Sequence, residues 1–536
     1  MGITWNSVSG GITWDGPARS LHRRAIIGAL ALATAGGVAV LPHASAAGPL
    51  PDLASVEQVV GAQQAWQAGA TGQGIDVAVI DTGVTPVPGL DAPAKVMYGP
   101  DLSFDSQNPA TSYVDGYGHG TAMASIIAGN DGTAGGFQGV APNSRILSVK
   151  VGATNGATDV SQIIAGIDWT VKHAQDAGMN VRVINLSLGT SSTQYYVNDP
   201  LAAAAENAWK HGIVVVASAG NENSTNALAD PATDPYVLAV GAEDPVGTLS
   251  SADDTVPTWA NRGTGSRQPD LVAPGAYVMG LNVPGSTLAQ TYPNAVFGRF
   301  LRGSGTSQSA AIVSGAAADL LSANPSLTPD QVKAALMSTA TRISVANPNK
   351  VGSGLVNIPA ALAAPASTAV QNWVSATGAG SLELARGNSH IQLNGVTLTG
   401  DQDIFGNPWN GAAMAAAERN NTAWNGSGVY NGATWSGATW SGATWSGATW
   451  SSIPLSGATW SGATWSGATW SGATWSGATW SGATWSGATW SGATWSGATW
   501  SGATWSGATW SGATWSGATW SGATWSGSTW SGADYS

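Results

Sequence analysis

Residues 303–311 read Gly-Ser-Gly-Thr-Ser-Gln-Ser-Ala-Ala, with Ser307 at the centre. A glycine-rich turn leads into Ser307, and a mostly apolar run continues to Leu321, which predicts a buried helix. A serine at such a helix start has an exposed hydroxyl, and its N–H is among the first-turn donors that lack an intrahelical partner. This position suits a nucleophile that also helps to bind an oxyanion. By itself, however, a Gly-Thr-Ser before a helix is more often only an N-cap.

The region from Val56 to about Pro365 alternates short apolar runs with amphipathic ones. Helix patterns occupy 159–177, with Asp159 as N-cap, 200–211, closed by Gly212, and 328–338. The apolar runs between them are rich in Val and Ile on both faces, as buried parallel strands are. They lie at 75–80, 146–151, 181–186, 213–217 and 237–240. The alternation predicts an α/β domain at 56–365 with a doubly wound, mainly parallel sheet.

Four polar segments follow these strands, at the sheet edge where such domains bind ligands. The first expected strand ends in Asp81-Thr82-Gly83, and Asp115-Gly-Tyr-Gly118 leads to His119 and a helix. Ala219-Gly220-Asn221 comes after the strand at 213–217, and the turn with Ser307 is the fourth segment. Together they supply an acid, a base, an amide and a nucleophile.

Each of these residues also has a simpler interpretation. Asp81 could be a turn aspartate, His119 a helix-start histidine and Asn221 a turn cap. Gly118 and Gly120 on either side of His119 favour a close backbone approach and hence a function. Asp-Thr-Gly also occurs in aspartic proteases, but the chain has no second copy, so that chemistry would require a dimer. Patterns for zinc proteases, P-loops and dinucleotide sites are absent from the sequence.

The segments together resemble the subtilisin-like serine proteases (subtilases) over most of residues 56–365. The matching motifs are Val-Ile-Asp81-Thr-Gly, Gly-His119-Gly-Thr and Gly-Thr-Ser307, and the order Asp, His, Ser is the known order of that family. The resemblance implies that Asp81, His119 and Ser307 form a catalytic triad and that Asn221 binds the oxyanion. It also implies that residues 185–189 form an edge strand that pairs with substrate. It assigns substrate contacts to Ser187, Leu188, Gly189, Ala219 and Gly220.

The function implied is that of a secreted serine endopeptidase, which hydrolyses peptide bonds in protein or peptide substrates through an acyl-enzyme. No cofactor is required by this chemistry, and calcium enters only as a structural ion. Asn130-Asp131-Gly132 is a candidate calcium loop, although a plain turn is the simpler interpretation. The alternative function is a catalytically inactive subtilase fold that serves as a cell-surface binding or structural protein.

Two features depart from the family pattern. The common sequence after the nucleophile is Met-Ala-Ser/Thr-Pro, whereas this chain has Gln308 directly after Ser307. The short segment 47–55 has no room for the family's usual folding prodomain, so we expect the domain to fold unaided or with help from the C-terminal part.

Composition limits the partners and the compartment. The chain has 536 residues, a formal net charge of −12 and no cysteine, which excludes thiol chemistry and gives no support to a nucleic-acid partner. Arg23-Arg24 precede an apolar run from Ala25 to Leu41, and Ala44-Ser45-Ala46 offers a cleavage site. We therefore interpret residues 1–46 as a secretory signal peptide. The paired arginines favour the twin-arginine route over the general secretory one.

The C-terminal part has a different composition. Residues 366–429 read as a linker with a β-hairpin around Asn394-Gly395, and residues 430–536 repeat Ser-Gly-Ala-Thr-Trp with a period of five. Five residues turn a helix by about 140° and reverse the face of a straight strand, so neither aligns the tryptophans. A coil with four pentads per turn does, which resembles the right-handed β-helices of pentapeptide-repeat proteins with Trp in place of Leu. The alternatives are a flexible Trp-rich tail that contacts the cell wall or surface, and an inert spacer.

Overall fold

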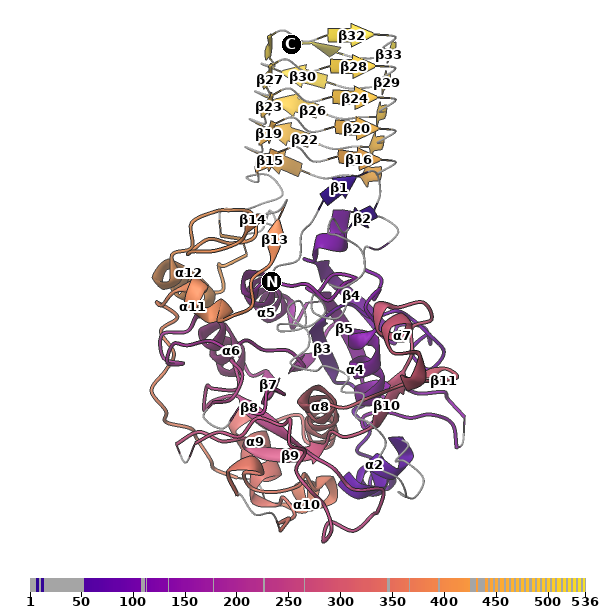
Figure 1. Ribbon diagram of the computed structural model, residues 1–536, viewed down its shortest axis with the longest axis vertical. Coiled ribbons are helices and arrows are strands. Elements are labelled where there is room, and N and C mark those ends of the chain that lie inside the picture. The colour runs from indigo at the N-terminus through magenta and orange to yellow at the C-terminus, as the bar shows by residue number, and fades with distance from the viewer. Residues whose placement is uncertain are drawn as a thin grey trace, which may run out of the picture.

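A seven-stranded parallel sheet forms the centre of the computed structural model (Figure 1), with the strand order β4-β5-β3-β6-β7-β8-β9. The structure describes residues 53–107, 111, 113–133, 135–176, 178–224, 227–264, 266–344, 348–365, 367–393, 396–424 and 430–431, and otherwise only the backbone of short strands near the two ends. The sheet strands are β3 (Asp76–Asp81), β4 (Val96–Asp101), β5 (Arg145–Lys150), β6 (Val181–Leu186), β7 (Val214–Ser218), β8 (Leu238–Glu243) and β9 (Leu271–Pro274).

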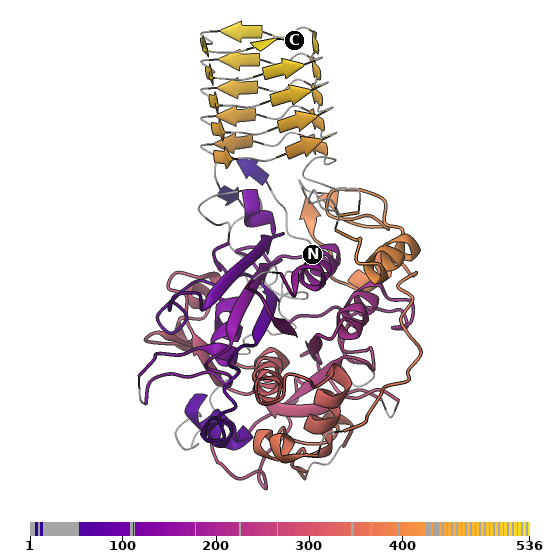
Figure 2. The same ribbon diagram turned by 180° about the vertical axis from the view of Figure 1, so that it is seen from behind.

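Two pairs of helices cover the faces of this sheet (Figures 1 and 2). One face carries α4 (His119–Ala128) and α8 (Thr306–Ala323), and the other carries α5 (Val160–His173) and α6 (Pro200–Lys210). Because both faces are covered, every residue of β3, β7, β8 and β9 is buried. The predicted α/β fold with a mainly parallel sheet is therefore confirmed.

Local signals place the helix ends. Asp159 caps α5 through a capping box with Gln162, as the sequence predicts for the cap residue. For α6 the cap is Asp199, and Pro200 takes the first helical position, where its missing N–H costs nothing. Thr328 caps α9 (Pro329–Ser338). Strand β4 was not anticipated because its residues are mostly part-exposed and include Gly99 and Pro100.

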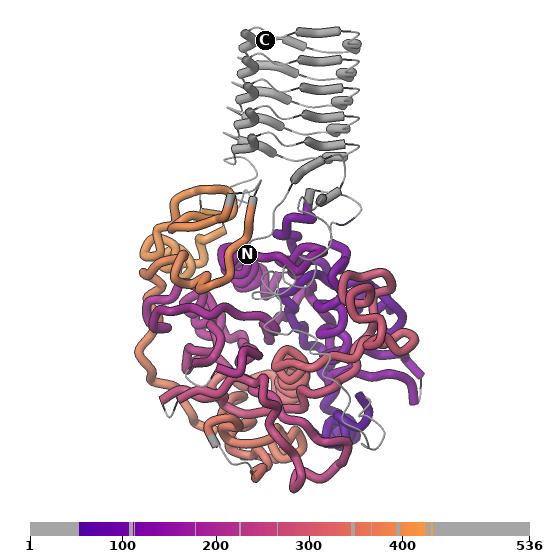
Figure 3. The backbone as a smooth tube through the Cα atoms, in the orientation of Figure 1, coloured from indigo at the N-terminus to yellow at the C-terminus, as the bar shows by residue number. Residues whose placement is uncertain are grey.

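A small antiparallel sheet precedes the Ser307 turn, in the strand order β10-β12-β11. It contains β10 (Val278–Leu281), β11 (Val296–Phe297) and β12 (Phe300–Gly303), with α7 (Thr287–Thr291) and η2 (Pro293–Ala295) between β10 and β11. The remaining elements of the body, which the tube in Figure 3 follows, are α2 (Leu53–Val60), α3 (Ala62–Gln67), η1 (Phe104–Gln107), η3 (Pro348–Lys350) and α10 (Ile358–Ala363).

The region after residue 366 contains the strand pair of the predicted hairpin, but it also contains helices that the prediction of a linker did not include. It contains α11 (Leu382–Arg386), the antiparallel strands β13 (Gln392–Leu393) and β14 (Val396–Thr397), and α12 (Gly411–Arg419). In both ribbon views α11 and α12 lie beside α5 and α6. Residues 367–424, together with Tyr430, are thus part of the globular body, and we call them the C-terminal segment.

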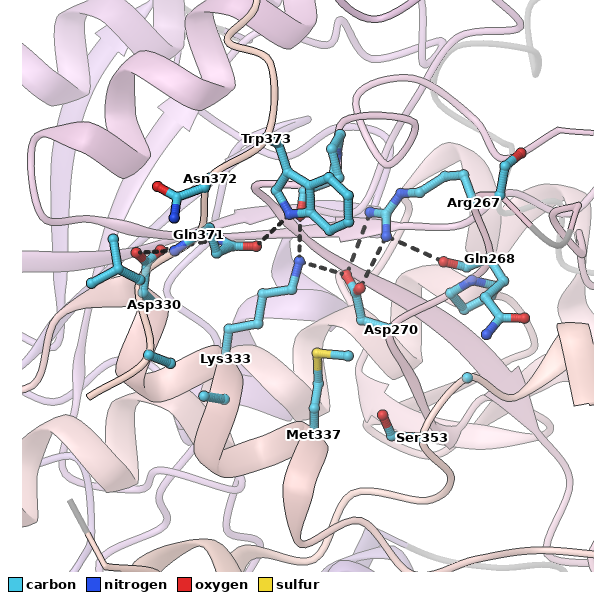
Figure 4. Close-up of a pocket in the computed structure, with 17 residues that line it drawn as sticks. Arg267, Gln268, Asp270, Asp330, Lys333, Met337, Ser353, Gln371, Asn372 and Trp373 are labelled. Carbon is cyan, nitrogen blue, oxygen red and sulfur yellow. Dashed lines mark hydrogen bonds and ion pairs between the residues drawn. The ribbon is translucent and has the colours of Figure 1, made fainter. Parts of the chain in front are cut away.

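A cavity of about 580 Å³ lies where α9 meets the start of the C-terminal segment (Figure 4). Inside it, Lys333 contacts Asp270 at 3.1 Å, and Asp270 also pairs with Arg267. Gln371 of the C-terminal segment donates to Asp330 through both its backbone and its side-chain nitrogen. The charged groups that line the cavity are thus bonded within the chain. The contacts between Gln371 and Asp330 help to anchor the C-terminal segment.

Only the backbone strands of the terminal regions are described. Strands β1 (Asn6–Val8) and β2 (Gly11–Thr13) pair antiparallel, and the rest of the expected signal peptide lies outside the described residues. In the repeats, strands recur at every pentad from β15 (Thr439–Ser441) to β34 (Asp534–Tyr535). Each strand from β15 to β30 (Thr514–Ser516) pairs in parallel with the strand four pentads later, as Thr439 does with Thr459. In the described part of the chain, no helix has both the length and the apolar character to cross a membrane.

Candidate active site

Asp81 and His119 form a buried pair at the carboxyl edge of the sheet. Asp81 is the last residue of β3, and His119 is the first residue of α4. Nδ1 of His119 lies 2.9 Å from both carboxylate oxygens of Asp81, and their exposed fractions are 4 % and 3 %. This contact holds the imidazole proton on Nδ1 and leaves a lone pair on Nε2. Nε2 is buried and has no hydrogen-bond partner.

The surroundings of His119 favour its protonated form. Burial of the ring by itself lowers the pKa of His119. The charge of Asp81, the hydrogen bond with Asp81 and the charge of Asp115 act in the opposite direction, and the pKa of His119 ends above its ordinary value. The imidazole is thus equipped to accept a proton during a reaction and to hold it beside a carboxylate.

Ser307 is the second residue of α8 and is fully buried. Its hydroxyl donates to the carbonyl oxygen of Ser187 at 2.9 Å, and the Ser187 hydroxyl donates to the carbonyl oxygen of Ser307 at 2.9 Å. The side-chain amide of Asn185 donates to the Ser187 hydroxyl at 2.9 Å. The end of β6 and the start of α8 are therefore fixed to each other at the nucleophile candidate.

The side chain of Asn221 is oriented by Thr306. Its Oδ1 accepts from the backbone nitrogen of Thr306 at 2.9 Å and from the Thr306 hydroxyl at 3.0 Å. Nδ2 of Asn221 is buried and has no partner. A buried donor or acceptor without a partner is costly and rare, and it indicates a place where a partner atom is expected. His119 Nε2 and Asn221 Nδ2 both have this property.

The predicted substrate-contacting residues lie close to this site but are not an edge strand. Asn185 pairs with Val79 of β3 and with Val216 of β7, so β6 is a central strand. The chain leaves the sheet only after Leu186, and beyond it Thr190 forms a bridge with Asp230. The edge-strand prediction was therefore wrong for Asn185. Leu188 and Ala219 are almost fully buried.

Gly220 and Gly189 fit where a larger residue would not. Gly220 has a φ of 105°, and a Cβ there would lie 2.2 Å from Asn261 Nδ2. A Cβ on Gly189 would lie 2.8 Å from the carbonyl oxygen of Asp230. These positions allow the backbone on both sides of the site to approach its neighbours closely.

The candidate calcium loop does not fit that role. The carboxylate of Asp131 pairs with Arg299 at 2.6 Å and accepts from the backbone nitrogen of Phe137. Asn130 accepts from the Gly132 nitrogen at 2.8 Å, which is a local turn contact. Within the described ranges there is no group of three or more His, Cys, Asp or Glu side chains that could hold a metal ion.

Comparisons with known proteins agree with this geometry. Residues 72–380, more than half of the chain, match the subtilase family (Peptidase_S8). The chain is 35 % identical over 297 residues to Serine protease AprX of Bacillus subtilis (strain 168), covering 54 % of this chain and 66 % of AprX. It is 35 % identical over 302 residues to Subtilisin Savinase of Lederbergia lenta, covering 56 % of this chain and 96 % of that protein.

Among solved structures, fervidolysin from Fervidobacterium pennivorans, described as a keratinolytic enzyme related to subtilisin, is 30 % identical. The similarity covers 58 % of this chain and 46 % of fervidolysin, with a TM-score of 0.48. The chain thus spans less than two thirds of AprX and less than half of fervidolysin.

A buried carboxylate–imidazole pair, a serine at a helix start and an amide donor without a partner are the kinds of group that serine hydrolases use. The chain belongs to the subtilase family, and its catalytic domain is a serine-type endopeptidase domain.

Proposed function

We propose that the protein is a secreted endopeptidase in which Ser307, His119 and Asp81 act as a catalytic triad. His119 Nε2 takes the proton of the Ser307 hydroxyl as Oγ attacks the peptide carbonyl carbon, and Asp81 stabilises the imidazolium that forms. The leaving amine receives this proton when the C–N bond breaks, which leaves an acyl group on Ser307. Water, activated in turn by His119, then releases the acid product and restores the serine.

The observation that supports this proposal is that two buried nitrogen atoms, His119 Nε2 and Asn221 Nδ2, have no hydrogen-bond partner. His119 Nε2 lacks the proton donor it needs, and Asn221 Nδ2 lacks an acceptor. In the mechanism, the Ser307 hydroxyl meets the first need, and the oxyanion meets the second together with the Ser307 N–H. In the structure the Ser307 hydroxyl donates to the Ser187 carbonyl oxygen instead. Catalytic hydrogen bonds often form only when substrate is bound, so this contact is compatible with the role.

Labelling with a fluorophosphonate tests the assignment. Such a reagent reacts with an activated serine, whose oxygen displaces fluoride and forms a phosphonate ester, and peptide mapping of the full chain should find the label on Ser307. The control is Ser309→Ala, since the Ser309 hydroxyl donates to the carbonyl oxygens of Ala273 and Pro274, and this variant should still take the label. Absence of label from the folded wild-type protein would favour an inactive fold with a binding role.

The proposal also covers how the chain is exported and how the repeats fold. Residues 1–46 direct secretion by the twin-arginine route, and the repeats at 430–536 form a right-handed β-solenoid that contacts the cell wall or surface. The pairing of each backbone strand with the strand four pentads later supports a coil of that period. The test is far-UV circular dichroism of the full chain against a variant ending at residue 431. The difference spectrum should be that of β-structure, and a random-coil difference would refute the solenoid.

A further inference from the structure

The carboxylate of Asp115 is fully buried and accepts four hydrogen bonds. The Thr82 hydroxyl and the Gly118 nitrogen donate to Oδ1 at 2.8 and 2.7 Å. The nitrogen and the hydroxyl of Thr121 donate to Oδ2 at 2.8 and 2.7 Å. Two carboxylate oxygens offer about four lone-pair sites, so four donors leave no place for a proton. Burial raises the pKa of Asp115 above its ordinary value, but these hydrogen bonds and the charge of Lys150 oppose the rise, so the hydrogen-bond geometry favours the anion.

These bonds join the two loops that carry the buried acid and base. Thr82 follows Asp81, and its nitrogen donates to Asp81 Oδ1 at 2.7 Å. The same threonine accepts, through its hydroxyl, from the Gly120 nitrogen at 3.0 Å. Gly120 has no room for a side chain, because a Cβ there would lie 2.2 Å from the carbonyl oxygen of Gly83. The two backbones thus meet beside His119, and Asp115 bonds to the Thr82 side chain on one of them and to the Gly118 and Thr121 nitrogens on the other.

We propose that Asp115 is a positioning residue for hydrolysis, which holds Asp81 and His119 at their contact distance through Thr82 and the first turn of α4. The inference rests on the proposed function, because it assigns Asp115 a role only through those two residues. A displacement of reacting groups by about 1 Å can reduce turnover about 100-fold, so a residue that fixes their spacing has a measurable effect.

The charges around Asp81 and His119 give the positioning role of Asp115 a measurable consequence, a change in the pKa of His119. Asp81 from β3 and Asp115 both face His119, and both raise its pKa. Tyr117 lies on the same loop as Asp115. Burial raises its pKa most, and the charges of Asp81 and Asp115 raise it further. From β5, the Lys150 ammonium donates to the Thr82 carbonyl oxygen at 2.8 Å and pairs with Asp105 of η1 at 3.0 Å. Loss of the Asp115 charge should therefore lower the pKa of His119.

A purely structural role is the alternative, because buried carboxylates commonly cap helices. Asp199 provides a matched control. It is also fully buried and accepts four hydrogen bonds, from Leu201 N, Ala202 N, Ser192 Oγ and Gln194 Nε2. It caps α6 and bonds to no residue of the candidate site.

The experiment compares Asp115→Asn, Asp199→Asn, Thr82→Val and Thr82→Ser in the full chain. Each variant is titrated with fluorophosphonate to count active sites, and kcat and KM for a peptide substrate are measured against pH. For Asp115→Asn we expect kcat per titrated site to fall about 10- to 100-fold with little change in KM. The acid limb of kcat/KM should move to lower pH by roughly half a unit. Asp199→Asn should unfold at lower temperature with an unchanged pH profile.

The threonine variants separate geometry from charge. Thr82→Val removes the hydroxyl link but keeps the Asp115 charge, so kcat should fall while the acid limb stays in place. Thr82→Ser keeps the hydroxyl and should restore most of kcat.

An Asp115→Asn enzyme with wild-type kcat and an unmoved acid limb would overturn the inference. If Asp115→Asn does not fold, a wild-type kcat in Thr82→Val would overturn the inference instead. A wild-type chain that neither hydrolyses peptide nor takes the label refutes the proposed function, and the inference with it, before any variant is made.

Discussion

Arg386 of the C-terminal segment and Asp159, the N-cap of α5, form an ion pair in which neither side chain has any exposed surface. The guanidinium Nε lies 2.6 Å from Asp159 Oδ2, and its other nitrogens donate to the carbonyl oxygens of Gly400 and Gln402. The pair joins residues 227 positions apart in the sequence. It fixes the C-terminal segment to the helix layer of the catalytic domain.

Replacement of Arg386 should therefore destabilise the whole domain. Arg386→Ala leaves the Asp159 carboxylate buried without its cation, which typically costs about 3–5 kcal/mol of unfolding free energy. The measurement is urea unfolding followed by tryptophan fluorescence. The control is Arg299→Ala, which removes a part-exposed ion pair with Asp131 and should cost about 0–1 kcal/mol. Equal losses in the two variants would contradict the anchoring role of Arg386.

A second anchor of the C-terminal segment should make stability depend on pH. The Tyr430 hydroxyl donates to Asp168 Oδ2 at 2.9 Å, and Asp168 Oδ1 is buried without a partner. Burial raises the pKa of Asp168 to about 8, although the hydrogen bond from Tyr430 opposes the rise. Burial and the charge of Asp168 also raise the pKa of Glu418. The folded state then binds a proton that the unfolded state has lost, so stability should fall as pH rises from about 4 to 8.

Asp168→Asn tests this linkage. The amide oxygen still accepts from Tyr430 but carries no charge, so the decline of stability over that pH range should become smaller. At pH 9 the variant should be more stable than the wild type by roughly 1–3 kcal/mol. Thermal unfolding of both proteins from pH 5 to pH 9 provides the measurement. Parallel curves with the same slope would show that Asp168 does not control the pH response.

Ser307→Ala should abolish peptide hydrolysis without unfolding the domain. The substitution removes the hydroxyl that attacks the carbonyl carbon but leaves the backbone start of α8 unchanged. Casein hydrolysis and circular dichroism are measured on the same preparation. A folded variant that still cleaves casein would show that Ser307 is not the nucleophile.

Asn221→Ala should lower kcat with only a small change in KM. Its Nδ2 acts mainly in the transition state, when the oxyanion forms. The expected loss is about 100- to 1000-fold, the range known for this donor in the subtilisin family itself. Asn261→Ala is the neighbouring control, since Asn261 bonds to Glu222 and Ser224 rather than to the candidate oxyanion position. An effect of Asn221→Ala on KM alone would indicate that it only binds substrate.

The sequence predicted those parts of the fold whose signal is local. Strand β7 is apolar on both faces and bounded by turns, and α5 begins with a recognisable capping box. The C-terminal segment was misjudged because single residues anchor it. Trp424 donates to the carbonyl oxygen of Ala165, and no periodic pattern records a contact of that kind. Such partners are set by tertiary packing, which propensity and periodicity do not contain.

The residues of the candidate site likewise fall into two groups, those that a local motif predicts and those whose role depends on a tertiary contact. Asp81, His119, Ser307 and Asn221 lie in short motifs and were found through a family resemblance. Asp115 begins one of these motifs, but no sequence pattern assigns it a role, because its hydrogen bond to Thr82 spans 33 residues. The orientation of Asn221 by Thr306 was missed for the same reason.

The last prediction concerns oxidation, and it starts from Gln308. Family members commonly carry methionine directly after the nucleophile, whereas Gln308 has no sulfur. Oxidation of a thioether makes the side chain polar and larger. Gln308 is only 6 % exposed, and its Nε2 lies 2.4 Å from where a Cβ on Gly303 would be, so a bulky sulfoxide there would displace Ser307. We therefore expect the wild-type enzyme to resist peroxide and Gln308→Met to be inactivated much faster.

Fluorophosphonate labelling of Ser307 in the full chain is the readout, since damage to the many tryptophans of the repeats does not enter it. Shortening the chain near Pro365 is unsuitable, because it removes the C-terminal segment. Met123 lies four residues beyond His119 but is only 1 % exposed, so peroxide should reach it slowly. The half-buried Met279 on β10 is the control position, and Met279→Leu should leave the wild-type half-life unchanged. Equal, rapid loss of labelling in the wild type and in Gln308→Met would show that position 308 does not govern oxidative stability.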